Sequence, residues 1–575
     1  MADGAAAGPS RLLVPHRPLL VLTLLALSLY LPCVWLRDVW APDEPRYAEV
    51  MREMVSRGDY ILPHLNGEVY SEKPPVFFWL GILAGLLPGI PPDAGSRLVS
   101  ALASLGTLLL TWRIFSRLGN PRTAWLACII LATSWMFVTH ATSGVIDATQ
   151  SFLITAAIAA GMAARRERSF VLWAVFYGAI GVALITKGPV GLAIPVGVLI
   201  LMTVQEDGPA GLRARHPLWG LPLAAFIASL WLFPVILKGG PEYAHVILFK
   251  QNIGRAYEAF HHAEPIHYFL SVFPGSFLPW VLLLPGGIWL AVTQMKDRQM
   301  RDRQTVGTAE SAAARLALTW FGFTFLFFSV ISGKKTRYLL PLFPAASWLA
   351  ALELRALVVP AAGSGWAARL RPRFTAGLCA AVMFTLAIGL IAAGAGLLGE
   401  PAARIEGLSD EQASALSWYA SPPGGLLLIV PGIAAAVLGA GALWSLRRRP
   451  ARAAACVLAC VIVVIGAAQW IGLSALNHVK SAMPLARIVE RAAGPGGAVI
   501  MYRDQHSGLF NVALRRDHIT EMNHNVITAD HLEANPGMVV IAVAADMERL
   551  KRVHPGLRVL GCRRVGEEVI CAGQS

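Results

Sequence analysis

The chain has 575 residues, of which 55% are hydrophobic and only 15% are charged, with a mean hydropathy of +0.56. This charged fraction lies well below the roughly 25% of soluble domains, which excludes a soluble enzyme. The net charge is +14, but the sequence has no basic, aromatic-rich soluble domain of the kind that binds nucleic acid. We therefore attribute the excess of Lys and Arg to membrane topology.

Apolar runs of about 20 residues, the length that crosses a bilayer, predict a polytopic α-helical membrane protein. No small-residue cleavage site closely follows the first run, so we interpret it as a retained helix. Residues 75–90 form an apolar run of only 16 residues, with Gly81, Gly85 and Pro88 inside it, which predicts an interfacial or re-entrant segment. We therefore predict about 13 crossings, near 18–36, 97–116, 123–140, 148–164, 170–186, 188–204, 217–237, 268–294, 314–331, 339–357, 375–397, 424–446 and 453–474.

Lys and Arg concentrate in alternate connections between these runs, as the positive-inside rule requires. With a cytoplasmic N-terminus, every inside connection is basic, including the triple arginine at 447–449. The outer side then receives the loops 38–96, 238–267 and 398–423, together with everything after 475.

The C-terminal residues 476–575 have a different pattern from the transmembrane domain expected over 1–475. A helical stretch, strand-like runs (AVIMY, MVVIAVA) and polar turns alternate there, which predicts a small extracytoplasmic α/β domain. The string GCRRVGEEVICA predicts a hairpin with a two-residue turn, in which Gly566 comes first as a type II′ turn prefers. This register places Cys562 and Cys571 opposite each other as a non-hydrogen-bonded pair, which predicts a disulfide in an oxidising compartment.

The first outer loop, residues 38–96, holds the densest cluster of charged residues. Asp43 lies at the start of a predicted helix, where it is a helix cap alone or a catalytic residue, and the two roles can coexist. Residues 44–57 separate into two faces, as in an amphipathic helix at a membrane surface. The apolar face holds Tyr47, Val50, Met51, Met54 and Val55, and the charged face holds Arg46, Glu49, Arg52, Glu53 and Arg57.

Lys73 lies between Glu72 and the stiff pair Pro74-Pro75, at the depth of a lipid phosphate; the alternative interpretation is a snorkelling anchor. Other polar residues lie at membrane boundaries on the same predicted side, although the positive-inside rule depletes cations there. Charges that oppose this bias indicate a functional site. These residues are Arg97, Asp147, Lys187 in ITKGPVG, Arg255 in KQNIGRAYEAFHH, and Lys334 and Tyr338 in SGKKTRYLLP.

The string PDEPRYAEVMREMVSRGDYILPHLNGEVYSEKPPVFFW, followed by SRLVSALAS, ITKGPVG, FLPW and the KxxxYLLPLFP turn, resembles the polyprenyl-phosphate-dependent membrane glycosyltransferases of the GT-C fold. Among them, it resembles the 4-amino-4-deoxy-L-arabinose transferases that modify lipid A, with the protein O-mannosyltransferases as a more distant branch. The resemblance covers residues 1–350 and is loose beyond them. It implies a polyprenyl-phosphate-linked sugar donor, a lipid or glycolipid acceptor, and a bacterial inner-membrane location with a periplasmic active site.

By this resemblance, Asp43 corresponds to the essential first-loop aspartate and Asp147 to the acidic residue of the second outer loop, with Glu44 as a further acidic candidate. The implied donor-phosphate contacts are Lys73, Lys187, Arg255 and Tyr338. The implied substrate-binding residues are Arg46, Tyr47, Tyr70, Glu72, Arg97 and Lys334. The sequence departs from the family at Pro45, where the family has threonine, and in its 334–338 turn, which carries two additional cations.

The expected reaction is a single displacement, which inverts the anomeric centre and needs one carboxylate base. Fixed cations stabilise the charge that develops on the leaving phosphate. We expect no cofactor, because the sequence has no phosphate-cradling glycine loop and no CxxC pair. A divalent ion on His64, His261 and His262 is the less favoured alternative, since histidines in polar loops are more often solvated.

The acceptor stays open at this level. A lipid A phosphate is already largely ionised at pH 7 and needs no base, whereas a hydroxyl acceptor does. Two other classes of protein compete with a transferase. A lipid-linked sugar transporter or flippase would place ionisable residues at mid-membrane, and a sensor or scaffold would leave the first-loop charges unexplained.

Overall fold

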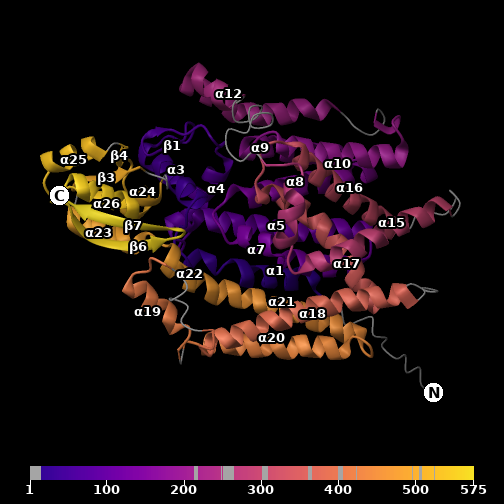
Figure 1. The fold of residues 1–575 in the computed structure, drawn as a ribbon. Helices are drawn as coiled ribbons and strands as arrows, with labels where there is room; N and C mark the ends of the chain where they lie inside the picture. Colours follow the sequence, from indigo (N-terminus) through magenta and orange to yellow (C-terminus); the bar gives the residue numbers. More distant parts are fainter. Residues whose placement is uncertain are drawn as a thin grey trace.

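The computed structural model describes residues 14–212, 218–247, 249, 264–300, 309–359, 366–398, 406–421, 424–494, 496–503, 508–523 and 525–575. Long helices form the body of the molecule, and a sheet lies at one end of it, beside the first outer loop (Figure 1). The helices of the first half are α1 (Pro18–Tyr30), α2 (Cys33–Leu36), α5 (Gly95–Leu118), α6 (Pro121–Ala132), α7 (Trp135–Ala141), α8 (Ile146–Glu167), α9 (Phe170–Lys187), α10 (Val190–Asp207), η3 (Leu218–Gly220) and α12 (Leu221–His245).

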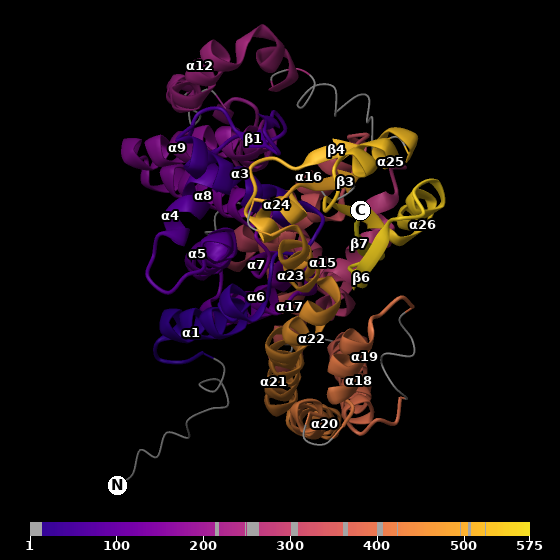
Figure 2. The same ribbon diagram turned by 90° about the vertical axis from the view of Figure 1, so that its left-hand side faces the viewer.

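The second half of the helical body places α18, α20 and α21 on the opposite side from α12, as both views show (Figures 1 and 2). Its helices are α14 (Tyr268–Ser276), η5 (Trp280–Leu283), α15 (Leu284–Met300), α16 (Ala309–Val330), η6 (Thr336–Leu342), α17 (Phe343–Val358), α18 (Trp366–Gly394), α19 (Asp410–Trp418), α20 (Leu426–Ser445), α21 (Pro450–Ala467), η8 (Ala468–Gly472) and α22 (Leu473–Lys480).

The described residues contain 11 helices that are long and apolar enough to cross a membrane, and 13 spans when each of two bent pairs counts as one. The bent pairs, α6 with α7 and α14 with the helices after it, fall on the runs predicted at 123–140 and 268–294. Pro279 lies in the second break, as expected of a residue that cannot donate to a helix ladder. The chain is therefore a multi-pass membrane protein, with the spans where the sequence predicts them.

The first outer loop forms α3 (Asp43–Arg57), β1 (His64–Leu65), β2 (Glu68–Val69), α4 (Val76–Gly85) and η2 (Pro92–Ala94). The helix α4 has only 10 residues, too few to cross a bilayer. It is followed by a turn and η2 and packs against α5, the next spanning helix. The short apolar run at 75–90 is thus an accessory helix and not a crossing, in agreement with the sequence prediction.

The C-terminal region holds a five-stranded sheet of order β4-β3-β5-β7-β6, in which β3 is parallel to β4 and β5 while β7 is antiparallel to β5 and β6. In β3, alternate side chains enter separate cores on the two faces, which explains its continuous apolar sequence. Its elements are α23 (Met483–Ala493), β3 (Val499–Tyr502), α24 (Leu509–Leu514), β4 (Thr520–Met522), α25 (Asn525–Ala534), β5 (Val539–Val543), α26 (Ala544–Val553), β6 (Arg558–Val565) and β7 (Glu568–Gln574).

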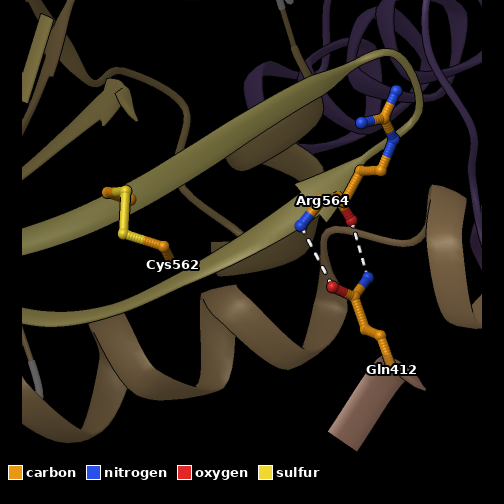
Figure 3. Close-up of a disulfide and its surroundings, with 4 residues drawn as sticks. Gln412, Cys562 and Arg564 are labelled. Atoms are coloured by element: carbon orange, nitrogen blue, oxygen red, sulfur yellow. Dashed lines mark hydrogen bonds between the residues drawn. A yellow bond between two sulfur atoms is a disulfide. The ribbon is translucent and has the colours of Figure 1, made fainter. Parts of the chain in front are cut away.

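The β6–β7 hairpin confirms the predicted register. Cys562 lies opposite Cys571, and the two form a disulfide (Figure 3). Gly566 opens the turn with φ +68°, the positive value for which glycine is suited. The side-chain amide of Gln412, from α19, accepts a hydrogen bond from the N–H of Arg564 at 3.1 Å and donates one to its carbonyl at 2.8 Å.

The charged face of α3 differs from the prediction. Glu49 and Glu53 are fully buried, Glu49 beside Gly508 of the C-terminal region and Glu53 against Gly67 of the β1–β2 hairpin, and Val55 of the predicted apolar face is exposed. Arg52 joins the two parts, at 2.6 Å from Glu49 and 2.7 Å from Asp517. Burial raises the pKa of Glu49 to about 7, although the hydrogen bonds and charge of Arg52 oppose this rise.

Candidate active site

One cavity of about 580 Å³ brings together polar residues from four parts of the chain. This volume lies within the range of small-ligand sites. Apolar side chains of α12 and α16, among them Trp231, Phe327 and Phe328, form much of its wall. The polar lining consists of Glu72, Lys73, Asp147, Gln150, Lys187, Arg337 and Tyr338.

Asp147 and Lys187 form an ion pair across this cavity. Asp147 lies in the first turn of α8 and Lys187 is the last residue of α9, so each charge sits at the helix end whose dipole favours it. Gly188, with φ +91°, and Pro189 end α9 directly after the lysine. The Lys187 ammonium also lies 4.9 Å from the ring centre of Tyr338, which ties a third lining residue to the pair.

Asp43 is the first residue of α3, and its carboxylate is paired with the guanidinium of Arg337. Its side chain makes no capping hydrogen bond, and the N-cap position is Pro42, so the capping interpretation is wrong. Burial acts to raise the pKa of Asp43, but the positive charges of Arg337, Lys335 and Arg46 outweigh burial and hold this pKa below its usual value. Asp43 is therefore ionised at neutral pH. It does not line the cavity itself, but it is paired with Arg337, which does.

Lys73 reaches the cavity from the segment that precedes α4. Its ammonium donates to the carbonyl of Glu72 at 3.2 Å, and the carboxylate of Glu72 pairs with Arg46 at 3.3 Å. Lys73 and Asp147 thus line the same cavity, as the predicted topology requires of two residues on one side of the membrane.

Two predicted site residues lie away from the cavity lining, in a buried cluster. Glu44 pairs with Arg37 and lies 3.5 Å from Arg97, and it accepts the N–H of Gly144 at 3.1 Å. Arg97 also lies 3.7 Å from Asp93. A carboxylate committed to two arginines and a backbone N–H is unsuited to proton transfer, so this cluster anchors the first outer loop to α5 and α8.

Three other predicted contacts are arranged differently from expectation, and a fourth is not among the described residues. Tyr47 and Tyr70 are buried against Phe77 and Phe78 of α4, where they pack the loop. Lys334 is buried, with its ammonium donating to the carbonyl of Glu264 at 2.7 Å. Arg255 lies outside the described residues.

Candidate metal ligands are the remaining prediction. His261 and His262 lie outside the described residues, and His64 belongs to β1. Within the part of the chain that the structure describes, no three His, Cys, Asp or Glu side chains form a group that could hold a metal ion.

Arg337 is the charged lining residue that is absent from the predicted set. The signal for it is the additional cation in the 334–338 turn, next to Tyr338. Its importance comes from its partner, Asp43, which precedes it by 294 residues and is joined to it only by the folding of η6 onto the first outer loop.

Known proteins of similar sequence or fold include membrane transferases. Residues 17–249 match the family described as dolichyl-phosphate-mannose-protein mannosyltransferase. The undecaprenyl phosphate-alpha-4-amino-4-deoxy-L-arabinose arabinosyl transferase of Shewanella sediminis is 30% identical over 326 residues, which cover 56% of this chain and 57% of that protein. Its counterpart in Aeromonas salmonicida is 33% identical over 336 residues, which cover 57% and 59%. The chain thus spans a little under three fifths of these relatives.

The likeness of fold extends over nearly the whole chain. The crystal structure of ArnT from Cupriavidus metallidurans bound to undecaprenyl phosphate matches with a TM-score of 0.71 at 20% identity, covering 97% of this chain and 98% of that one. The same protein in the apo state gives a TM-score of 0.69. The chain therefore has the GT-C fold, and over part of its length it is similar in sequence to the aminoarabinosyl transferases and to the protein mannosyltransferase family.

Proposed function

We propose that this protein is a glycosyltransferase that moves a sugar from a polyprenyl-phosphate carrier to an envelope acceptor. The observation that carries the proposal is the single cavity that combines three cations, Lys73, Lys187 and Arg337, with the carboxylate of Asp147 and, through Arg337, that of Asp43. The cations would bind the phosphate of such a donor, and the apolar wall of the cavity would contact its lipid chain.

The reaction that suits this arrangement is one displacement at the anomeric carbon. The acceptor oxygen forms a bond to that carbon while the bond from the carbon to the phosphate oxygen breaks, and the electron pair of the broken bond stays on the polyprenyl phosphate. The developing phosphate charge is stabilised by Lys73, Lys187 and Arg337, which are in place before the reaction. The product is inverted at the anomeric centre, and no nucleotide takes part.

The role of Asp43 depends on the acceptor. A hydroxyl acceptor must lose its proton, which Asp43 takes as general base. An ionised phosphate acceptor loses no proton, and Asp43 then acts through the orientation of Arg337.

The relatives suggest two chemical assignments. The curated relatives are named as transferases of 4-amino-4-deoxy-L-arabinose from undecaprenyl phosphate, which supports aminoarabinose-type transfer to lipid A or a related glycolipid. The match of residues 17–249 to the mannosyltransferase family supports, as the second candidate, transfer of mannose to a protein hydroxyl. We place the site and the C-terminal region on the periplasmic side of a bacterial inner membrane, with the N-terminus in the cytoplasm. This orientation rests on the basic inside connections and on the disulfide, which needs an oxidising compartment.

The test is transfer by the purified, reconstituted protein in a matrix of two labelled donors and two acceptors. Undecaprenyl phosphate carries either aminoarabinose or mannose, and the acceptors are lipid A and a peptide rich in serine and threonine. Label in lipid A from the aminoarabinose donor supports the first assignment, and label in the peptide from the mannose donor supports the second. Movement of intact donor across the vesicle membrane without transfer would instead identify a flippase and refute the proposal.

A further inference from the structure

Arg337 lies between the carboxylate of Asp43 and the cavity, and it contacts both. It lines the cavity together with Lys73 and Tyr338, yet its guanidinium is paired with Asp43, outside the lining. A guanidinium carries five N–H donors and has no acceptor. Among the described residues, Arg337 donates a hydrogen bond to one oxygen of Asp43, which leaves further donors for a ligand. Its side chain is 21% exposed, which leaves part of it accessible from the cavity.

The other two acids around the cavity form their ion pairs with different cations, although the charge of Arg337 also acts on Asp147. Asp147 is paired with Lys187, and Glu72 with Arg46. Arg337 is therefore the cation through which a ligand in the cavity can act on Asp43. A phosphate, like a carboxylate, can present two oxygens to the planar fork of a guanidinium, so the two anions compete directly for it.

We propose that the guanidinium of Arg337 exchanges Asp43 for the donor phosphate, so that donor binding releases the carboxylate of Asp43. This inference rests on the proposed function and adds an order to it: the donor binds first, and the base becomes available only then. While the ion pair is intact, the proton affinity of Asp43 is suppressed. Once the phosphate holds Arg337, Asp43 loses its principal cationic partner, and burial favours its uptake of a proton.

The released carboxylate fits the hydroxyl branch of the reaction. The acceptor O–H proton goes to the released carboxylate of Asp43, the oxygen bonds to the anomeric carbon, and the carbon–oxygen bond to the phosphate breaks with its electron pair retained by the phosphate. Arg337, by then bonded to that phosphate, stabilises the charge that arrives there. One side chain thus links occupancy of the donor site to the readiness of the base.

The inference predicts how two substitutions act together on the binding of undecaprenyl phosphate, measured without any transfer. Arg337→Gln should weaken binding about tenfold or more, as expected for the loss of a charged hydrogen-bonding group. Asp43→Asn, although it abolishes proton transfer, should tighten binding roughly fivefold, because Arg337 no longer has to leave a carboxylate. In the double variant this gain should disappear.

The sign of the coupling separates exchange from simple repulsion between Asp43 and the phosphate. If Asp43 only repelled the ligand, Arg337 would mask its charge, and Asp43→Asn would tighten binding more when Arg337 is absent. Exchange gives the opposite result, a larger gain when Arg337 is present. A gain that is equal or larger in the Arg337→Gln background would overturn the inference.

Arg355→Gln is a matched control. Arg355 lies 18 residues further along the same helical segment, is also 21% exposed, and is paired with Glu310 at 2.8 Å. It lies more than about 25 Å from Arg337 along the helix axis, so its loss should leave binding unchanged. If the unmodified protein fails to bind undecaprenyl phosphate, the proposed function and the exchange are both overturned. If the unmodified protein binds undecaprenyl phosphate and Arg337→Gln binds it equally well, the exchange is overturned and the proposed function is not.

Discussion

Asn66 joins the first outer loop to the C-terminal region, and its removal should separate them. It lies at the turn of the β1–β2 hairpin with φ +53°. Its side-chain oxygen accepts from the N–H of Ile519 at 2.7 Å and from Asn511 at 2.8 Å, and its side-chain nitrogen donates to the carbonyl of Ile519 at 3.1 Å and to Glu521 at 3.0 Å. The perturbation is Asn66→Gly, since glycine adopts positive φ without strain.

The magnitude follows from the four hydrogen bonds that are lost. At a net value of about 0.5–1.5 kcal/mol each, their removal should cost on the order of 2–6 kcal/mol of docking free energy. The upper part of this range applies if Asn511, which is fully buried, is left without a replacement partner. Because α3 carries Asp43 and lies beneath the C-terminal region, loosened docking should also reduce transfer.

Hydrogen exchange of the reconstituted protein measures this effect. Asn66→Gly should speed exchange in residues 508–523 by about tenfold or more, while exchange in the α17 core stays as in the unmodified protein. Asn535→Gly is the control, because the side chain of Asn535, directly after α25, donates to the carbonyl of His531 in that helix and makes no hydrogen bond to the described residues of the outer loop. Unchanged protection of 508–523 in a folded Asn66→Gly protein would refute the reasoning.

Four further predictions each concern one or two residues. Asp43→Asn should insert and fold normally and, for a hydroxyl acceptor, lose transfer 100-fold or more; Lys73→Ala should fold and weaken donor use, and normal steady-state rates would contradict both roles. Glu49 has its folded-state pKa raised from 4.5 to about 7, so its contribution to stability is fully present below about pH 4.5 and is lost as pH rises through 7. The free energy of unfolding should fall by an amount on the order of 3 kcal/mol. In Glu49→Gln, the thermal unfolding midpoint should therefore change less with pH between pH 5 and 8, and an unchanged pH dependence would contradict this. Mass spectrometry of envelope protein should find Cys562 and Cys571 linked, and two reduced thiols would count against the oxidising compartment.

The features that the sequence predicts well are those determined by short stretches of chain. A run of about 20 apolar residues is long enough to cross a bilayer wherever it occurs, so the spans follow from length and composition. The pairing of Cys562 with Cys571 follows from counting outward from one turn, because strand register has a strict period of two.

The features that it predicts poorly depend on contacts between distant segments. Arg46, Glu49 and Glu53 form a charged face that is typical of a solvated helix surface, but α24 approaches that face closely. Gly508, with φ +86°, lies so near that a Cβ atom there would be 3.1 Å from the Cβ of Glu49. The sequence does not predict the role of Arg337 for the same reason, because nothing in the turn itself indicates that Asp43 lies beside it.

Gln412 affects whether molecules of this protein can associate with one another. Strand β6 is at the edge of its sheet, and an edge strand presents unpaired N–H and C=O groups that can recruit a strand from another molecule. The amide of Gln412 occupies both groups of Arg564, as a neighbouring strand would (Figure 3). Beside it, Glu411 pairs with Arg563 at 2.5 Å. Since α19 lies between α18 and α20, the connection that joins two membrane helices also shields the sheet from self-association, and a Gln412→Ala protein would carry an open edge into the crowded space beside the membrane.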